Sequence, residues 1–231
     1  MSPTIPLFIM LHTETVEART LALIRKLMSD HQLEEFFLVD GTALSLLMGH
    51  RQSIDVDLFC RWTFNVKGLS RYLKKRYQVE NLQTLKKGVS CHIDGVKVDM
   101  LTHDHQRIDF WLEEDGIRME SLKDLGAMKL NAIVVKGTRL EDFVDMYFLL
   151  ESESLEYFLG ALEIKYPKIS RKMATIALTF YRSIEPTTIV FAGTPITRQE
   201  LSRRFDEAIL QPLKVFERTP LPGRDAWRAR D

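Results

Sequence analysis

The chain has 231 residues, of which 45% are hydrophobic and 28% are charged, and this composition excludes a disordered tail or a fibre. It suits one globular domain, or a core domain with a smaller helical partner. The 32 basic residues equal the 32 acidic residues in number, so no overall positive field attracts nucleic acid, and a polyanion would need a local basic patch.

In chain order, the first feature is the apolar run IPLFIML at residues 5–11. It is much shorter than the roughly 20 residues of a membrane span, and it has neither a basic leader nor a small-residue cleavage site. The two cysteines, Cys60 and Cys91, are too few for a disulfide framework and favour a reducing compartment. We therefore expect a soluble, cytoplasmic protein with no membrane partner. An amphipathic helix is predicted over 14–31, where apolar residues recur among charged ones.

A buried strand, FFLV at 36–39, leads into Gly41 and Thr42, which predict a strand-to-helix turn. The helix that follows covers 43–48 and ends at Gly49. Glycine lets a phosphate approach the backbone, and a helix N-terminus offers free N–H groups and a favourable dipole. The turn is a candidate phosphate site, with a plain helix cap as the alternative.

Residues 54–60 predict the next strand, and it carries two aspartates. Residues two apart on a strand point to the same face, so Asp55 and Asp57 project side by side, while Ile54, Val56 and Leu58 share the other face. Like charges at that separation raise each other's pKa unless a cation compensates, and a divalent metal with oxygen ligands does so. The pair predicts a Mg²⁺ site, although a D-x-D pair alone often faces solvent.

A basic helix over 69–77 and three strands over 78–85, 89–93 and 96–101 follow. The helix is either a solvated face or a local patch for an RNA backbone. The Asp94-Gly95 dipeptide favours a tight type I′ hairpin between the last two strands, so the sheet is mixed with an antiparallel end.

The strand over 96–101 contains one carboxylate, Asp99, in an apolar setting. If this strand lies beside 54–60, Asp99 joins Asp55 and Asp57. Three carboxylates on neighbouring strands can hold two metal ions roughly 3.5–4 Å apart, which is chemistry for phosphoryl or nucleotidyl transfer.

Beyond Ser121, an N-cap with Asp124 at the capping-box position, the pattern is helical. Helices are predicted over 121–136, 139–151, 154–165, 168–182 and 197–210, with a loop between Pro186 and Pro195. We expect an α+β fold with a mixed sheet and flanking helices. Its parts are a core over 1–120, a helical domain over 121–211 that completes the active site, and a loose tail over 212–231.

Two helical positions carry charge where packing is expected. Lys129 falls on the apolar face of the helix over 121–136, as a snorkelling side chain or as a functional one. Asp142 and Asp145 lie three apart on the next helix and share a face.

Three motifs together resemble the nucleotidyltransferase-like toxins of the AbiEii/AbiGii family, relatives of polymerase-β-type nucleotidyltransferases. They are G-T-A-L at 41–44, G-H-R-x-S-x-D-x-D-L-F at 49–59 and G-V-K-V-D at 95–99. The resemblance extends to 116–133 and 141–151, so it covers about residues 36–155.

The resemblance implies transfer of a nucleotide from an NTP with two Mg²⁺ ions. It implies that Asp55 and Asp57 are metal ligands and that Asp99 is a metal ligand or the base for the acceptor hydroxyl. It also implies that Lys129 contacts the phosphates and pairs with Asp142. The implied nucleotide-binding residues are Gly41, Thr42, Arg51, Ser53 and Lys129. Arg51 has helix capping as its alternative role, and Ser53 would orient the metal-binding loop.

Two positions depart from the family pattern. Asp40 stands where the family usually has the first glycine of G-G-T, and its charge should weaken triphosphate binding unless a cation such as Lys129 offsets it. Glu141 stands where the family usually has Lys or Arg. His103 and His105, in a loop, are interpreted as solvated polar residues rather than metal ligands.

The leading hypothesis is a metal-dependent nucleotidyltransferase that moves a nucleoside monophosphate from an NTP to a macromolecular acceptor. The expected acceptor is RNA such as a tRNA end, and the expected partner is an antitoxin protein. One alternative is a catalytically impaired nucleotide-binding or protein-interaction module, which Asp40 and Glu141 motivate. Another is a small-molecule nucleotidyltransferase of the aminoglycoside-modifying kind.

Overall fold

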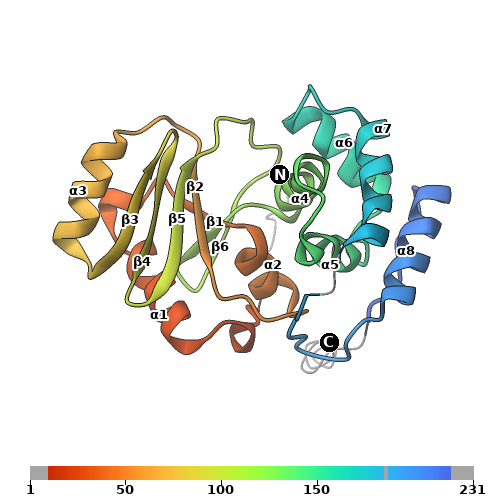
Figure 1. Ribbon diagram of the computed structural model, residues 1–231, viewed down its shortest axis with the longest axis horizontal. Coiled ribbons are helices and arrows are strands. Elements are labelled where there is room, and N and C mark those ends of the chain that lie inside the picture. Colours follow the sequence, from red (N-terminus) through yellow and green to blue (C-terminus); the bar gives the residue numbers. More distant parts are fainter. Residues whose placement is uncertain (1–9, 185–186, 220–231) are drawn as a thin grey trace, which may run out of the picture.

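The computed structural model describes residues 10–184 and 187–219, in which a seven-stranded sheet stands beside a group of helices (Figure 1). This is the expected α+β fold with a mixed sheet. The strand order is β3-β4-β5-β2-β1-β7-β6. The strands are β1 (Phe37–Val39), β2 (Val56–Cys60), β3 (Val79–Leu85), β4 (Gly88–Ile93), β5 (Val96–Thr102), β6 (Leu112–Glu114) and β7 (Ile117–Met119).

Helices flank the sheet at one end and gather beside it at the other. Figure 1 shows α3 next to β3, α2 between the sheet and the later helices, and α4 to α8 together on the far side of α2. The part of the chain that the structure describes contains no helix with both the length and the apolar character to cross a membrane. The helices are α1 (Ala18–Met28), α2 (Asp40–Met48), α3 (Val66–Arg76), α4 (Leu122–Val135), α5 (Leu140–Leu149), α6 (Leu155–Lys165), α7 (Arg171–Ala177) and α8 (Arg198–Leu210).

The centre of the sheet sets the position of the predicted carboxylates. β2 runs parallel to β5, and Asp57 lies directly opposite Asp99 in the register. On the other face of these strands, Val56, Leu58 and Val98 are at most 1% exposed. Burial of that apolar face fixes the register, because a shift of one residue would move every side chain to the other face. The strand that carries Asp99 therefore lies beside the strand that carries Asp57, as the prediction of a three-carboxylate group required.

The segment before β2 differs from the prediction. β2 begins at Val56, two residues later than expected, and Ile54 is 64% exposed instead of buried. The reason is that the preceding residues pair elsewhere: the Gln52 amide donates to the carbonyl of Val190 over 2.7 Å, and the Ser53 amide donates to the carbonyl of Thr15 over 3.0 Å. Asp55 therefore lies in a connecting segment rather than in the strand.

The helix after β1 also begins earlier than predicted. α2 starts at Asp40, so Gly41 and Thr42 form its first turn instead of a separate turn. Asp40 has a φ of 59°, in the left-handed region that aspartate tolerates better than most residues. Gly49, with a φ of 67°, ends the helix as expected.

The hairpin of β6 and β7 was not predicted. Its turn, Asp115-Gly116, has φ angles of 52° and 71°, close to the 52° and 77° of the predicted turn at Asp94-Gly95. The Asp115-Gly116 dipeptide was the sequence signal for this hairpin, but β6 and β7 have only three residues each and are too short to show the alternation of a strand. Through a parallel pairing of Leu38 with Met119, this hairpin extends the sheet on the outer side of β1.

The helical part begins as predicted, with the Ser121 hydroxyl accepting the amide of Asp124 at the start of α4. The helix predicted over 168–182 is shorter, because α7 starts after its N-cap Ser170 and gives way to a 3₁₀ turn over 178–183. Residues 212–219, predicted as the start of a loose tail, contact the helices: the amide of Phe216 donates to the carbonyl of Leu150 over 2.9 Å. The rest of that tail, and most of the N-terminal apolar run, lies outside the described residues.

His103 differs from the solvated residue expected in that loop. Its Nε2 lies 2.8 Å from the hydroxyl of Tyr166, and its ring stacks on Phe59 with centroids 5.3 Å apart. The ring of His105 lies 4.7 Å from that of His103. Burial, together with the charges of Lys165 and His105, lowers the pKa of His103 to about 3. The histidine is part of the packing between sheet and helices.

This packing gives a pH-dependent stability. A histidine with an unfolded pKa of about 6.5 takes up a proton on unfolding between that pH and its folded pKa, so acid favours the unfolded state. We expect His103 to lower the free energy of unfolding from pH 7 to pH 5, by at most about 1.4 kcal/mol per pH unit, while the raised pKa of Asp57 contributes in the opposite direction. Urea unfolding at pH 5, 6 and 7 should therefore show His103→Gln gaining stability relative to the wild type as the pH falls. The exposed His31→Gln serves as control, and equal slopes for His103→Gln and wild type would contradict the assignment.

Candidate active site

A pocket of about 270 Å³ lies where the starts of α2 and α5 and the segment before β2 meet residues 188–190. Five predicted site residues line it: Gly41, Arg51, Ser53, Asp55 and Asp57. The other lining residues are Asp40, Gln52, Ile54, Arg139, Glu141, Thr188, Ile189 and Val190. The remaining predicted residues, Thr42, Asp99, Lys129 and Asp142, do not line the pocket, but each contacts or pairs with a residue that does.

The three predicted metal ligands gather around Lys97. The ammonium of Lys97 lies 3.1 Å from Oδ2 of Asp99 and 3.6 Å from Oδ2 of Asp55. Asp57 lies opposite Asp99 on the parallel strand. The Ser90 hydroxyl donates to Asp99, which fixes that carboxylate from the neighbouring strand β4.

The charge in this group is not balanced. Burial raises the pKa of Asp57 to about 7, and the charges of Asp40, Asp99 and Asp55 act in the same direction against that of Lys97. A bound cation would favour the ionised form of this carboxyl group over the protonated form. Carboxylate oxygens are the donors that hard divalent cations prefer, and Asp55 and Asp57 line the pocket with Asp99 beside Asp57, so the chemistry of these residues fits Mg²⁺.

A second acidic group, formed by Asp40, Asp142 and Asp145, has carboxylate oxygens within 4.8 Å of one another. The ammonium of Lys129 lies among them, 2.8 Å from Asp142, 2.8 Å from Asp145 and in contact with Asp40. Burial alone would lower the pKa of Lys129, but the charges of Asp145, Asp40 and Asp142 raise it above its ordinary value. We call this group of four residues the lysine cluster. The positive charge of Lys129 balances part of the negative charge of these three carboxylates, so a protein side chain takes the place that a bound cation could take.

The lysine cluster gives Lys129 different surroundings from those expected of a phosphate ligand. Its side chain is only 1% exposed, and it does not line the pocket. The contact between Lys129 and Asp40 provides the cation that we expected to be needed to offset the extra negative charge of Asp40 beside a triphosphate. The expected pairing with Asp142 is present as a hydrogen bond of 2.8 Å.

Arg51 joins the pocket to the lysine cluster. Its Nε and Nη2 donate to the two oxygens of Asp145 over 2.6 and 2.9 Å, and His50 contacts the same carboxylate over 2.8 Å. Burial would raise the pKa of Asp145, but Lys129 and Arg51 hold it well below its usual range. Arg51 therefore binds a carboxylate and does not cap the carbonyls of α2.

Gly41 and Thr42 shape the first turn of α2 around these contacts. A Cβ added at Gly41 would lie 2.4 Å from Nη2 of Arg51, so only glycine allows the guanidinium to approach the backbone here. The Thr42 hydroxyl donates to the carbonyl of Asp55 and lies 2.8 Å from the Ser53 hydroxyl. These bonds tie the helix to the segment that carries Asp55.

Arg139 is a pocket residue that the sequence analysis did not single out. Its guanidinium lies 3.8 Å from Asp40 and 3.9 Å from Asp142, and its side chain is 47% exposed. These distances are longer than those of Arg51, so Arg139 is held loosely. Arg139 stands two residues before Glu141, the position that differs from the family pattern. A basic residue so close to that position was the sequence signal that could have identified it.

A family model described as "Nucleotidyl transferase AbiEii toxin, Type IV TA system" matches residues 22–229. The uncharacterized protein aq_aa25 of Aquifex aeolicus (strain VF5) is 27% identical over 177 residues, which are 71% of this chain and 85% of that relative. An antigenic nucleotidyltransferase-like protein from Paracoccidioides brasiliensis has a TM-score of 0.49 and 14% identity, with 88% of this chain and 96% of that chain covered. JHP933 from Helicobacter pylori has a TM-score of 0.45 and 16% identity, with 85% and 94% covered.

Proposed function

The chain belongs to the AbiEii family of nucleotidyltransferase toxins, and on that premise we propose that it transfers a nucleoside monophosphate from an NTP to a hydroxyl group of an RNA acceptor. The observation that carries the proposal is the register of β2 with β5, which sets Asp57 opposite Asp99 at the edge of a pocket that also contains the first turn of α2. The charge of the group supports a metal-dependent reaction in particular.

In this proposal Asp55, Asp57 and Asp99 would hold two Mg²⁺ ions. When bound, these ions would neutralise the triphosphate and lower the pKa of the acceptor hydroxyl. The backbone N–H groups at Gly41 and Thr42 would bind the triphosphate, because a helix N-terminus favours anions. Asp99, bonded by Ser90, would also be placed to accept the proton of the acceptor hydroxyl.

Two further roles follow from burial. Lys129 and Asp142 would act as positioning residues through the lysine cluster, since the side chain of Lys129 is 1% exposed. Arg51 would position Gly41 through its contact with the α2 backbone, while Ser53 would orient the segment before β2. We further propose a cytoplasmic toxin held by an antitoxin protein, because the matched family is described as part of a toxin-antitoxin system.

Transfer can be tested directly with purified protein, Mg²⁺, total RNA and each of the four α-³²P-labelled NTPs. We expect label from at least one NTP to appear in RNA, and EDTA to abolish it. Absence of transfer with all four NTPs, with Mn²⁺ as well as Mg²⁺, would contradict the enzyme. If calorimetry then shows binding of NTP with Mg²⁺, the impaired binding module, which Asp40 and Glu141 at the pocket favour, becomes the better description.

Arg139 gives a prediction for the triphosphate. Its loose contacts and its exposure allow its guanidinium to move to a phosphate, which would restore the positive charge that Glu141 does not supply. A hydrogen bond to a charged group contributes about 1.5–3 kcal/mol, so Arg139→Gln should lower kcat/KM for the NTP roughly 10- to 150-fold.

The matched control is Arg171→Gln on α7. Arg171 is also 47% exposed and also pairs with two acidic residues, Glu156 and Glu163. Steady-state transfer assays should show no change for this variant. Equal kcat/KM for Arg139→Gln and wild type would remove Arg139 from the phosphate site.

A further inference from the structure

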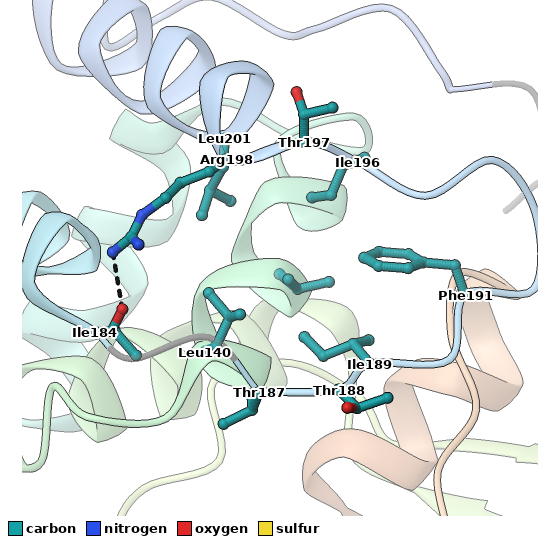
Figure 2. Close-up of a pocket in the computed structure, with 11 residues that line it drawn as sticks. Leu140, Ile184, Thr187, Thr188, Ile189, Phe191, Ile196, Thr197, Arg198 and Leu201 are labelled. Carbon is teal, nitrogen blue, oxygen red and sulfur yellow. Dashed lines mark hydrogen bonds between the residues drawn. The ribbon is translucent and has the colours of Figure 1, made fainter.

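A second cavity of about 370 Å³ lies next to the candidate active site, between the starts of α5 and α8 and the segment 187–191 (Figure 2). Thr188 and Ile189 line both this cavity and the active-site pocket. The two spaces are therefore neighbours separated by one short segment. The apolar walls of the second cavity come from Leu140, Val144, Ile189, Phe191, Ile196 and Leu201.

The first turn of α5 faces both spaces. Arg139 and Glu141 line the active-site pocket, whereas Leu140 and Val144 line the second cavity. Charged groups thus stand on one side of this turn and apolar groups on the other. A ligand with a polyanionic end and an apolar ring system has a matching distribution of chemistry.

The second cavity does not suit another anion. Among the described residues that line it, Arg198 is the charged one. Its Nη2 donates to the carbonyls of Ile184 over 2.8 Å and of Tyr181 over 2.9 Å, so its charge is directed at the backbone (Figure 2). The other polar groups of the lining are neutral hydroxyls, from Thr187, Thr188 and Thr197. Neutral donors and acceptors between apolar walls suit an uncharged heterocycle.

We propose, on the basis of the proposed function, that this cavity receives the nucleobase of the NTP whose triphosphate lies in the active-site pocket. Its volume lies in the range of about 300–1,000 Å³ that is typical of small-ligand sites. The ring of Phe191 extends into the cavity in Figure 2 and offers a face on which a base can stack. The threonine hydroxyls can bond to the edges of the base, which makes this cavity the place where one NTP is preferred over another.

The experiment compares two probes that differ in the nucleoside. One is the set of four NTP analogues with a methylene group between the α and β phosphorus atoms, which cannot transfer their nucleotide, and the other is inorganic tripolyphosphate. Calorimetry is carried out with each probe in Mg²⁺. Because stacking on an aromatic ring contributes roughly tenfold in affinity or more, the wild type should bind at least one analogue that much more tightly than tripolyphosphate.

Ile196→Trp fills the cavity from a half-buried loop position, and Val144→Phe fills it from α5. We expect both variants to bind the preferred analogue only as tightly as tripolyphosphate, while their affinity for tripolyphosphate equals that of the wild type. The matched control is Ile176→Trp, at a residue of α7 that is 49% exposed and lines neither space. Thermal unfolding checks that each variant is folded.

Three results would overturn the assignment of the base site. The first is wild-type affinity for the analogues in both folded variants. The second is an equal loss of analogue and tripolyphosphate binding, which places the effect at the phosphates. The third is a wild type that binds the analogues no more tightly than tripolyphosphate. A wild type that binds neither probe rejects the proposed function itself, and the base site with it.

Discussion

An Asp57→Asn variant is expected to lose nucleotidyl transfer by about 10³-fold or more, because metal ions contribute several kcal/mol to such reactions and each 1.36 kcal/mol is tenfold. The same variant should unfold at an equal or higher urea concentration than the wild type in EDTA at pH 8. Burial and neighbouring carboxylates raise the pKa of Asp57 to about 7, so at pH 8 its ionised form destabilises the folded state. An amide of the same shape removes that cost.

Activity and stability thus move in opposite directions, which distinguishes a metal ligand from a structural residue. Calorimetry should show a lower Mg²⁺ affinity for Asp57→Asn. Asp94→Asn is the control, since Asp94 occupies the hairpin turn with a φ of 52°, a conformation that asparagine also tolerates. Unchanged Mg²⁺ affinity in Asp57→Asn, or a clear loss of stability in EDTA, would count against Asp57 as a ligand.

Lys129→Met should lower the free energy of unfolding by about 3–5 kcal/mol, the cost of breaking a buried ion pair by removing one partner. The methionine fills similar space but leaves Asp40, Asp142 and Asp145 without the ammonium that contacts all three. Since orphaned carboxylates are more easily accommodated when protonated, the destabilisation should be smaller at pH 5 than at pH 8. Urea unfolding at both pH values measures the effect.

The control for this variant is Lys136→Met, at the exposed C-cap of the same helix. A surface substitution of this kind changes stability by no more than about 0.5 kcal/mol. If Lys129→Met were as stable as Lys136→Met, the lysine cluster would not be the structural element that its burial indicates. The transfer activity of Lys129→Met would then distinguish two roles. A loss of activity would indicate a phosphate ligand, and unchanged activity would indicate that Lys129 has no role in the reaction.

The carboxylates were predictable from the sequence because local alternation determines which face a strand residue occupies. The apolar residues Val56, Leu58, Val98 and Met100 all lie on the buried face, which leaves Asp57 and Asp99 on the other. The motifs of the family resemblance identified the same residues, and the family match over 22–229 confirms that resemblance. The roles of the individual residues remain proposals.

Other parts of the site depend on contacts between distant segments, which no local pattern encodes. Residues 188–190, which line the pocket, lie more than a hundred residues from Gln52 in sequence. The hydrogen bond from the Gln52 amide to the carbonyl of Val190 nevertheless fixes where β2 starts and leaves Ile54 exposed. The surroundings of Lys129 depend on three helices meeting, so periodicity could place it on an apolar face but could not supply its partners.

The lysine cluster and its neighbour Arg51 also bear on the cooperativity of unfolding. Asp40 and Arg51 belong to the sheet-bearing half of the chain, whereas Lys129 and Asp145 belong to the helical half. Unfolding of either half alone would break both ion pairs between the halves, Lys129 with Asp40 and Arg51 with Asp145. We therefore expect that the change of architecture near residue 120 is not a boundary of cooperativity, and that the described protein melts in a single transition, as one two-state unit.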